Sequence, residues 1–186
     1  MKRLFDLLLA LLAVFMLVVP ICLVAIVVRL TSKGPALYWS DRVGIDNVIF
    51  KMPKFRSMKI DTPAVATHLL QDPKSVLTPI GDFLRKSSLD ELPQLWCILK
   101  GDMSFVGPRP ALFNQEDLIV FRTEKSVHEL LPGLTGWAQV NGRDELPVFQ
   151  KVDLDAEYLR RRSFFFDIYI LWLTFVKVIR RDGVSH

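Results

Sequence analysis

Two adjacent carboxylates, Asp90 and Glu91, are the strongest candidates for chemistry in this sequence of 186 residues. They follow the basic pair Arg85-Lys86 and precede Pro93. A carboxylate in such a segment can attack phosphorus as a nucleophile, or it can hold a divalent cation through its oxygen atoms. The pair is therefore a candidate for reaction at phosphorus or for a metal site.

The same pair also fits a purely structural role at the start of a helix. Ser88 and Glu91 have the spacing of a capping box, and acidic residues favour the first turn. Pro93 argues against this role, because it would lie inside the helix, where its missing N–H and its ring disturb the turn. If the helix begins at Leu92 instead, Asp90 and Glu91 lie on its exposed approach.

Basic residues that could bind phosphate occur in two places. In the sequence Gly-Pro-Arg-Pro, Arg109 lies between Pro108 and Pro110, whose rigid backbone limits where the guanidinium can point. Arginine suits phosphate because its planar fork binds two oxygens at once. A structural turn with a surface arginine fits this motif equally well. Lys54 and Arg56 form a weaker basic pair, for which ordinary surface charge is the alternative.

A glycine-rich segment, residues 132–143, could bring backbone close to a ligand. Its polar members Gln139, Asn141 and Arg143 would add hydrogen-bonding groups. The segment is neither a Walker A loop nor a GxGxxG turn after a strand. An ordinary glycine-rich loop is the alternative.

The composition is that of a globular chain with one unusually apolar segment. Hydrophobic residues make up 51% of the sequence, and the formal net charge is +4. A mild positive charge suits anionic lipid or a phosphate-bearing substrate, and by itself also nucleic acid. Cys22 and Cys97 have no Cys or His nearby at metal-ligand spacing. This argues against a disulfide framework and fits a reducing compartment.

The apolar segment, residues 7–28, contains no charged side chain in its 22 residues. At about 1.5 Å per helical residue, it could cross a bilayer core of about 30 Å. A cleaved signal peptide is the alternative, but its apolar core would be shorter, and no small-residue cleavage site precedes Arg29. We therefore expect a membrane-associated helix.

The way this helix meets the membrane stays open. Lys2 and Arg3 stand before the segment, and Arg29 and Lys33 stand after it. Positive charge marks the cytoplasmic side, so neither end has a clear reason to cross. Pro20 would kink the helix. A straight span and a kinked, re-entrant helix with both ends in the cytoplasm are both consistent with this pattern.

The rest of the chain reads as short strands and helices separated by Gly and Pro turns. Two strands are expected around a turn at residues 44–47, and a further short strand at residues 138–140. Residues 81–86 should form a helical turn with Phe83 and Leu84 facing inward. Residues 164–181 are aromatic and apolar with two charges, which favours an amphipathic helix in the membrane interface over a second span. A buried core helix is the alternative. Helical segments are also expected at residues 92–100, 111–130 and 152–162, with one short helix in the loop 61–79.

These motifs together resemble one family. The runs SLDELPQLWCILKGDMSFVGPRP and PGLTGWAQVNGR, and the ending RRDGVSH, are similar to the bacterial sugar transferases, the small monotopic phosphoglycosyl transferases. KRLFD, DRVG and KFRSM match as well, so the resemblance covers essentially the whole chain. One departure concerns the re-entrant helix, which the family often breaks at Ser-Pro, whereas this chain has Val19-Pro20.

The resemblance implies a reaction in two steps. Asp90 would attack the β-phosphorus of a UDP-sugar, releasing UMP, and undecaprenyl phosphate would then take the phosphosugar from Asp90. It further implies Mg²⁺ held by Glu91 and Asp90. Substrate-binding roles would fall to Arg109, with help from Arg85, and to Lys54, Arg56, Gln139, Asn141 and Arg143. The sugar would be N-acetylated.

The fold implied is α+β and mostly helical, with a small β-hairpin and interfacial amphipathic helices. Residues 1–33 would form a re-entrant membrane helix, and residues 34–186 a catalytic domain facing the cytoplasm at the bacterial inner membrane. The expected partners are the UDP-sugar, undecaprenyl phosphate and the phospholipid bilayer, with no nucleic acid. Homo-oligomerisation stays open. The rival classes are a membrane-tethered scaffold and a lipid-diphosphate hydrolase.

Overall fold

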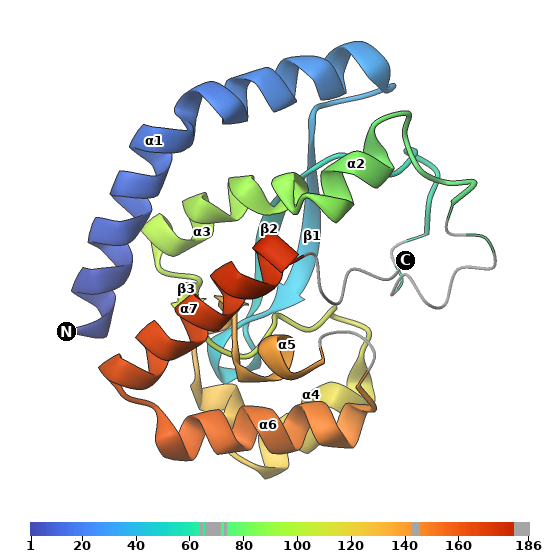
Figure 1. The fold of residues 1–186 in the computed structure, drawn as a ribbon. Coiled ribbons are helices and arrows are strands. Elements are labelled where there is room, and N and C mark those ends of the chain that lie inside the picture. Colours follow the sequence, from blue (N-terminus) through green and yellow to red (C-terminus); the bar gives the residue numbers. More distant parts are fainter. Residues whose placement is uncertain (64, 66–71, 73, 143–145, 181–186) are drawn as a thin grey trace.

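The computed structural model describes residues 1–63, 65, 72, 74–142 and 146–180 (Figure 1). Its elements, in chain order, are α1 (Lys2–Thr31), β1 (Leu37–Val43), η1 (Ile45–Asn47), β2 (Ile49–Phe55), α2 (Gly81–Lys86), η3 (Leu89–Gln94), α3 (Leu95–Lys100), β3 (Ser104–Val106), α4 (Glu116–Glu124), η4 (Val127–Glu129), β4 (Gly133–Thr135), α5 (Trp137–Asn141), α6 (Val148–Arg161) and α7 (Phe164–Arg180). The mostly helical α+β class is confirmed. Residues 64, 66–71 and 73 of the 61–79 loop lie outside the described residues, as does Arg143, and no helix occurs in the described part of that loop.

The predicted hairpin is confirmed as the antiparallel pair β1–β2, which runs in register from Leu37 opposite Phe55 to Val43 opposite Ile49. Its turn contains Asp46 and Asn47 with positive φ angles of 52° and 59°. Asp and Asn are, after glycine, the residues that best tolerate this conformation. The hairpin therefore forms from local sequence.

A second, parallel pair joins β3 to β4, with Ser104 opposite Gly133. The strand expected at residues 138–140 is wrong, because these residues lie in α5 and the strand comes earlier, at β4. At Gly133 a Cβ atom would lie 2.1 Å from the backbone nitrogen of Gly107. Gly133 and Gly136 thus both lie against the backbone of Gly107, where no larger residue would fit.

The short helices after the hairpin differ from expectation in one respect. Leu84 of α2 is buried, as predicted, but Phe83 is 65% exposed, so its inward position was wrong. A helix of six residues has a single buried side, and Leu84 occupies it. α3 ends at Gly101, whose φ of 105° is a conformation that favours glycine, and this end was predicted.

Helix α1 curves over the rest of the molecule and bends near its middle (Figure 1). Pro20 lies inside it, and a proline inside a helix removes one backbone hydrogen bond. The first half packs through Ala10 on the main hydrophobic cluster, and the second half packs through Val28 on Phe55 and Leu84. Both halves of α1 therefore rest on the same folded body.

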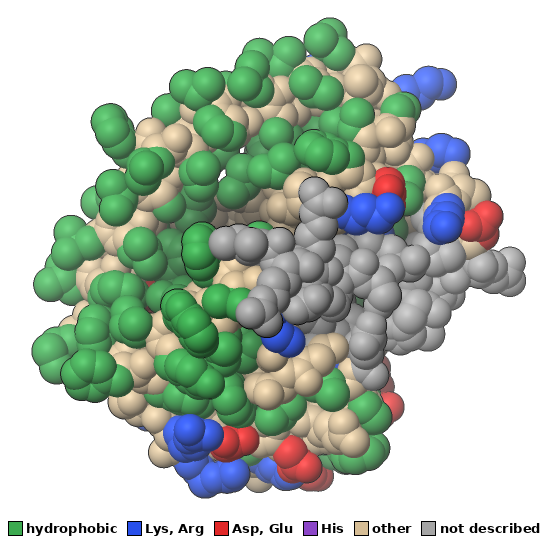
Figure 2. All heavy atoms as spheres, viewed as in Figure 1, with side chains coloured by type: hydrophobic (Ala, Val, Ile, Leu, Met, Phe, Trp, Pro, Cys, Tyr) green, Lys and Arg blue, Asp and Glu red, His purple; other side chains and the backbone are tan. Residues whose placement is uncertain are grey.

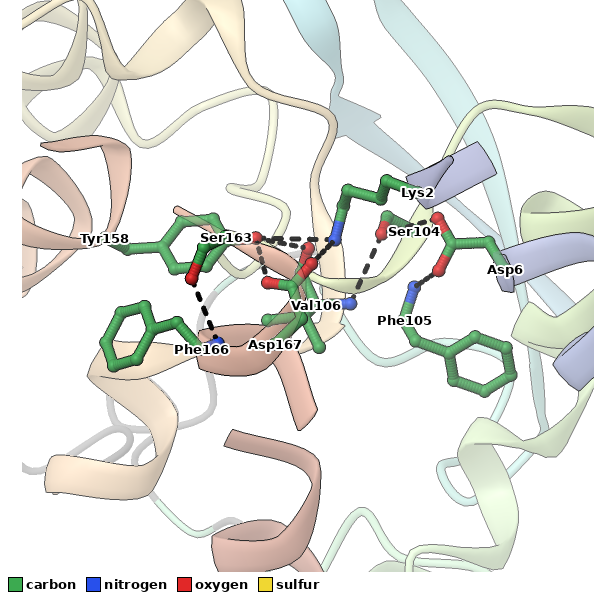
Figure 3. A network of polar contacts seen from close by, with 9 residues as sticks. All are labelled: Lys2, Asp6, Ser104, Phe105, Val106, Tyr158, Ser163, Phe166 and Asp167. Carbon is green, nitrogen blue, oxygen red and sulfur yellow. Dashed lines mark hydrogen bonds and ion pairs between the residues drawn. The ribbon is translucent and has the colours of Figure 1, made fainter. Parts of the chain in front are cut away.

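Polar contacts fix the start of α1 to the body (Figure 3). Asp6 is 2% exposed and accepts hydrogen bonds from Ser104 Oγ at 2.8 Å and from the Phe105 backbone nitrogen at 3.2 Å. Lys2 Nζ lies 2.6 Å from Asp167 Oδ2 of α7. The buried carboxylate of Asp6 is tolerated because its oxygens are hydrogen-bonded.

Helix α7 is amphipathic, as predicted, and not a fully buried core helix. Phe166 and Ile170 are buried in the main cluster, whereas Phe165 and Trp172 are 83% and 58% exposed. Hydrophobic side chains cover much of the face formed by α1 and α7, while charged ones gather over α6 and toward the far end of α1 (Figure 2). Within the described residues, α1 is the one helix that by length and composition could cross a membrane. Exposed apolar surface of this extent marks an interaction site, and a lipid surface fits it.

Candidate functional site

Asp90 and Glu91 lie in the first turn of the 3₁₀ helix η3, which also contains Pro93. Ser88 precedes this helix in the left-handed conformation, with a φ of 57°, and its side chain makes no capping hydrogen bond. The capping-box alternative is therefore wrong. The exposed approach is also wrong, because Asp90 is only 7% exposed. The pair is placed in a largely buried position by a tight turn.

Two cations bind the Glu91 carboxylate on the same oxygen. Lys54 Nζ lies 2.8 Å and Arg109 Nη2 lies 3.1 Å from Glu91 Oε1. The Lys54 and Glu91 side chains are 17% and 14% exposed, so this is a site inside the fold and not a surface ion pair. Lys54 comes from β2 and Arg109 from the loop after β3. Lys54, the weaker candidate from sequence, thus lies at the centre of the cluster.

The other basic candidates divide. Arg85, at the end of α2, lies close enough to Asp90 for its charge to lower the pKa of that carboxyl. Arg56 turns away, because its Nε donates to the carbonyl of Pro35 at 2.9 Å and its guanidinium lies over the Tyr38 ring. The structure therefore brings Arg85 to the carboxylates and leaves Arg56 bound at Pro35 and Tyr38.

The polar residues of the glycine-rich segment are not joined to this cluster in the described part of the chain. Asn141 Nδ2 donates to the carbonyl of Trp137 at 2.7 Å, within its own short helix. Gln139 is buried, and neither atom of its amide has a hydrogen-bond partner among the described residues. A buried amide without partners is costly, so Gln139 has capacity for a water molecule or a ligand.

The electrostatics of the two carboxylates differ. Burial raises the pKa of Asp90, and the neighbouring Glu91 charge adds to this, while Lys54, Arg85 and Arg109 oppose it. Burial would also raise the pKa of Glu91, but the charges and hydrogen bonds of Lys54 and Arg109 outweigh it and hold that pKa far below its ordinary value. Glu91 therefore stays ionised, while Asp90 is the more basic of the two.

This arrangement suits a nucleophile and its support. No hydrogen bond to the Asp90 carboxylate is seen among the described residues, and a more basic carboxylate attacks more readily once ionised. The surrounding cations could bind phosphate oxygens next to it. The site can thus combine attack by Asp90 with charge neutralisation by Lys54, Arg85 and Arg109.

The expected Mg²⁺ site has two carboxylates, Asp90 and Glu91, as its candidate donors among the described residues. No group of three or more His, Cys, Asp or Glu residues suited to a metal occurs in the described ranges. Carboxylate oxygens of Asp90 and Glu91 are nevertheless the hard donors that Mg²⁺ prefers, and this ion commonly takes its remaining ligands from substrate phosphates and water. Lys54 and Arg109 already bind Oε1 of Glu91. The atoms that could bind Mg²⁺ are therefore Oε2 of Glu91 and the carboxylate oxygens of Asp90.

Residues for which the sequence predicted no contact join α1 to the body. Lys2, Asp6 and Asp167 are members of the contacts in Figure 3. In the sequence these residues are marked only as charges at the borders of apolar segments, which is a weak signal. Their partners lie far away along the chain, so local reading could not assign them.

Replacing Arg109 with lysine is expected to reduce activity roughly 10²-fold, because the positive charge stays but the fork that can bind two oxygens is lost. Steady-state kinetics would measure this. The matched control is Arg161→Lys, whose side chain is 52% exposed and pairs with Glu157 on α6. Near-normal activity of the Arg109 variant would contradict a role in phosphate binding.

The chain belongs to the bacterial sugar transferase family, which it matches over residues 1–181. It is 41% identical over 186 residues to the UDP-glucose:undecaprenyl-phosphate glucose-1-phosphate transferase of Escherichia coli (strain K12), with 95% of this chain and 40% of that protein covered. It is 41% identical over 187 residues to the uncharacterized sugar transferase EpsL of Bacillus subtilis (strain 168), with 100% and 90% covered. The undecaprenyl-phosphate galactose phosphotransferase of Salmonella typhimurium is 38% identical over 172 residues, with 81% and 34% covered. The chain thus spans less than half the length of the E. coli and Salmonella relatives and most of EpsL.

Proposed function

We propose that this chain is a phosphoglycosyl transferase that moves a sugar-1-phosphate from a UDP-sugar to undecaprenyl phosphate. The observation that carries the proposal is the buried Asp90 beside Glu91, Lys54 and Arg109. The names of the relatives, which describe glucose and galactose phosphate transfer to undecaprenyl phosphate, support it. The product would be the first lipid-linked intermediate in assembly of a bacterial glycan.

The reaction is proposed to proceed in two displacements. An Asp90 carboxylate oxygen attacks the phosphorus that bears the sugar, the bond from this phosphorus to the bridging oxygen breaks, and UMP leaves with the electron pair. A phosphate oxygen of undecaprenyl phosphate then attacks the same phosphorus, and Asp90 leaves as a carboxylate. The lipid diphosphate sugar is released, and the enzyme returns to its starting state.

The neighbouring residues would bind and orient the phosphates. Arg109 and Lys54 can turn from Glu91 to the donor's oxygens, because both already point to one place in the site. Bound Mg²⁺, held by Asp90 and Glu91, would neutralise charge on the diphosphate. Glu91 stays ionised beside Asp90 and keeps the two cations in place when no substrate is bound.

The test is to supply the purified chain with undecaprenyl phosphate and a panel of UDP-sugars. The panel holds N-acetylated hexoses, expected from the family resemblance, beside glucose and galactose. We expect UMP and a lipid diphosphate sugar in equal amounts, from at least one donor. Release of UMP and free sugar-1-phosphate when the lipid is left out would indicate a hydrolase, and no reaction with any donor would favour a scaffold.

We also propose a monotopic arrangement at the bacterial inner membrane, in which residues 1–33 enter and leave the bilayer and residues 34–186 face the cytoplasm. Support comes from α1, whose start is bound to the body through Asp6 and whose end packs on Phe55 and Leu84. A straight span would separate these two ends by the bilayer. The bend at Pro20 leaves polar backbone groups that must find partners at membrane depth, which is the cost of this arrangement.

Cysteine labelling checks this topology. One cysteine is inserted after Met1, which leaves the Lys2–Asp167 pair intact, and another replaces the exposed Lys74, with Cys22 and Cys97 changed to alanine. The two introduced cysteines are expected to react with an impermeant thiol reagent only after the cells are opened, because the reagent then reaches the cytoplasmic face of the membrane. A separate variant that keeps the exposed Cys22 of α1 and changes Cys97 to alanine is the control, and its Cys22 should resist the aqueous reagent at bilayer depth. Labelling after Met1 in intact spheroplasts would establish a spanning helix.

A further inference from the structure

One guanidinium, that of Arg122 in α4, joins three separate parts of the fold. Its Nε and Nη2 donate to Asp155 Oδ2 at 3.0 and 2.7 Å, and its Nη1 donates to the backbone carbonyl of Arg109 at 2.8 Å. The Arg122 and Asp155 side chains are 12% and 1% exposed. Because a guanidinium holds its donors in a rigid plane, binding to Asp155 also sets the direction in which Nη1 points.

The backbone of residues 108–110 is held through its carbonyl groups. The first carbonyl accepts from the Gly133 backbone nitrogen at 2.9 Å, the second from Arg122, and the third from Arg42 Nη1 at 3.2 Å. The two prolines have no N–H, so they cannot contribute donors of their own. Arg122 therefore supplies the middle one of three consecutive attachments, at the residue whose side chain reaches Glu91.

Stability alone is a weak reason for such a pair. Desolvating two charges offsets much of their attraction, and apolar residues often replace a buried ion pair without loss of stability. Burial raises the pKa of Asp155, although Arg122 opposes this, so the fold carries a cost for keeping the carboxylate there. A role in orienting the 108–110 backbone accounts for that cost.

We propose that Arg122, held by Asp155, is a positioning residue that directs the Arg109 side chain toward Glu91 and the substrate phosphate. This inference rests on the proposed function for the role of Arg109. Arg122 itself contacts neither carboxylate of the Asp90–Glu91 pair among the hydrogen bonds and ion pairs of the described residues. Its effect passes through one carbonyl and the rigid backbone on either side of it.

The test begins with the double variant Arg122→Met, Asp155→Leu, which removes both charges and keeps apolar volume. We expect a folded protein whose kcat/KM falls about 10- to 100-fold, since small misplacements of binding groups cost about this much. Adding Arg109→Lys to the double variant should lower kcat/KM by less than about threefold further, because both changes act through the Arg109 side chain. Arg161→Met on α6 is the control and should leave kcat/KM unchanged. Full additivity with Arg109→Lys, or activity within about twofold of the unaltered protein, would overturn the proposal.

Amide hydrogen exchange tests the role of Arg122 independently of the proposed function, because the measurement needs no substrate. In the double variant, the Gly107 and Gly133 amides, which bond to Thr135 and Pro108, should exchange at least about tenfold faster. Amides of β1 and β2 away from this loop should not change. If exchange stays as in the unaltered protein, the loop is not held by Arg122 and the proposal fails, whatever the activity.

If the unaltered protein transfers no sugar, the proposed function fails, and the exchange result alone decides whether Arg122 positions the loop. Should the double variant not fold, Arg122→Lys gives the same readouts, since lysine keeps the charge near Asp155 but lacks the fork that reaches both partners.

Discussion

The Asp90→Asn variant is expected to lose more than about 10³-fold in turnover, because an amide cannot attack phosphorus and asparagine otherwise keeps the shape of the side chain. In the unaltered protein, incubation with a UDP-sugar alone should produce a phosphosugar adduct on Asp90. Intact and peptide mass spectrometry would detect this adduct, which the variant should lack. An adduct on another residue, or an active Asp90→Asn protein, would remove Asp90 from its role.

The same variant should fold at least as well as the unaltered protein. Burial raises the pKa of Asp90 in the folded state, so ionisation there costs stability, and this cost appears as the pH rises through the ordinary value of 3.8 and beyond. Asparagine carries no charge at any of these pH values. We therefore expect an equal or higher Tm for Asp90→Asn near neutral pH, with Asp102→Asn, a partly exposed partner of Lys100, as the control. A large fall in Tm would mean that lost activity reflects unfolding.

The Lys54→Met variant is expected to lose about 10²-fold or more in kcat/KM, because among the described residues it leaves Arg109 alone on the Glu91 carboxylate and removes a phosphate-binding charge from the site. Lys54 lowers the pKa of Asp90, so its loss should raise that pKa further. Since only the ionised carboxylate attacks, the acid limb of the pH–rate profile should move to higher pH. Steady-state rates across the acid range would measure both effects.

The chain offers a matched control for this experiment. Lys51 lies on the same strand, but its side chain is 66% exposed and pairs with Asp41 across the hairpin. Lys51→Met should keep both the rate and the position of the acid limb, whereas Lys54→Arg should recover part of the lost activity. An unmoved acid limb in Lys54→Met would show that Lys54 does not govern the ionisation of the nucleophile.

The sequence by itself determined the elements that depend on near neighbours. The apolar run predicted α1, the residues around the 44–47 turn predicted the hairpin, and the 164–181 pattern predicted amphipathic α7. The adjacency of Asp90 and Glu91 pointed to the site for the same reason, since two residues side by side in the chain remain together in any fold. Such signals survive because backbone conformation and side-chain periodicity are set over a few residues.

Tertiary structure decided burial, and with it the chemistry. Lys54 and Arg56 look alike in sequence, yet Lys54 meets Glu91, 37 residues away, and Arg56 meets Pro35 beyond the end of β2. The sequence left open whether Asp90 belongs to a helix cap or lies on an exposed approach, and Asp90 is in fact buried, which is what raises its pKa. The strand expected at residues 138–140 is a helix, because β3 pairs with the three residues at β4 instead. Each of these outcomes depends on contacts between segments far apart in the chain, and desolvation and charge interactions exist only once those contacts have formed.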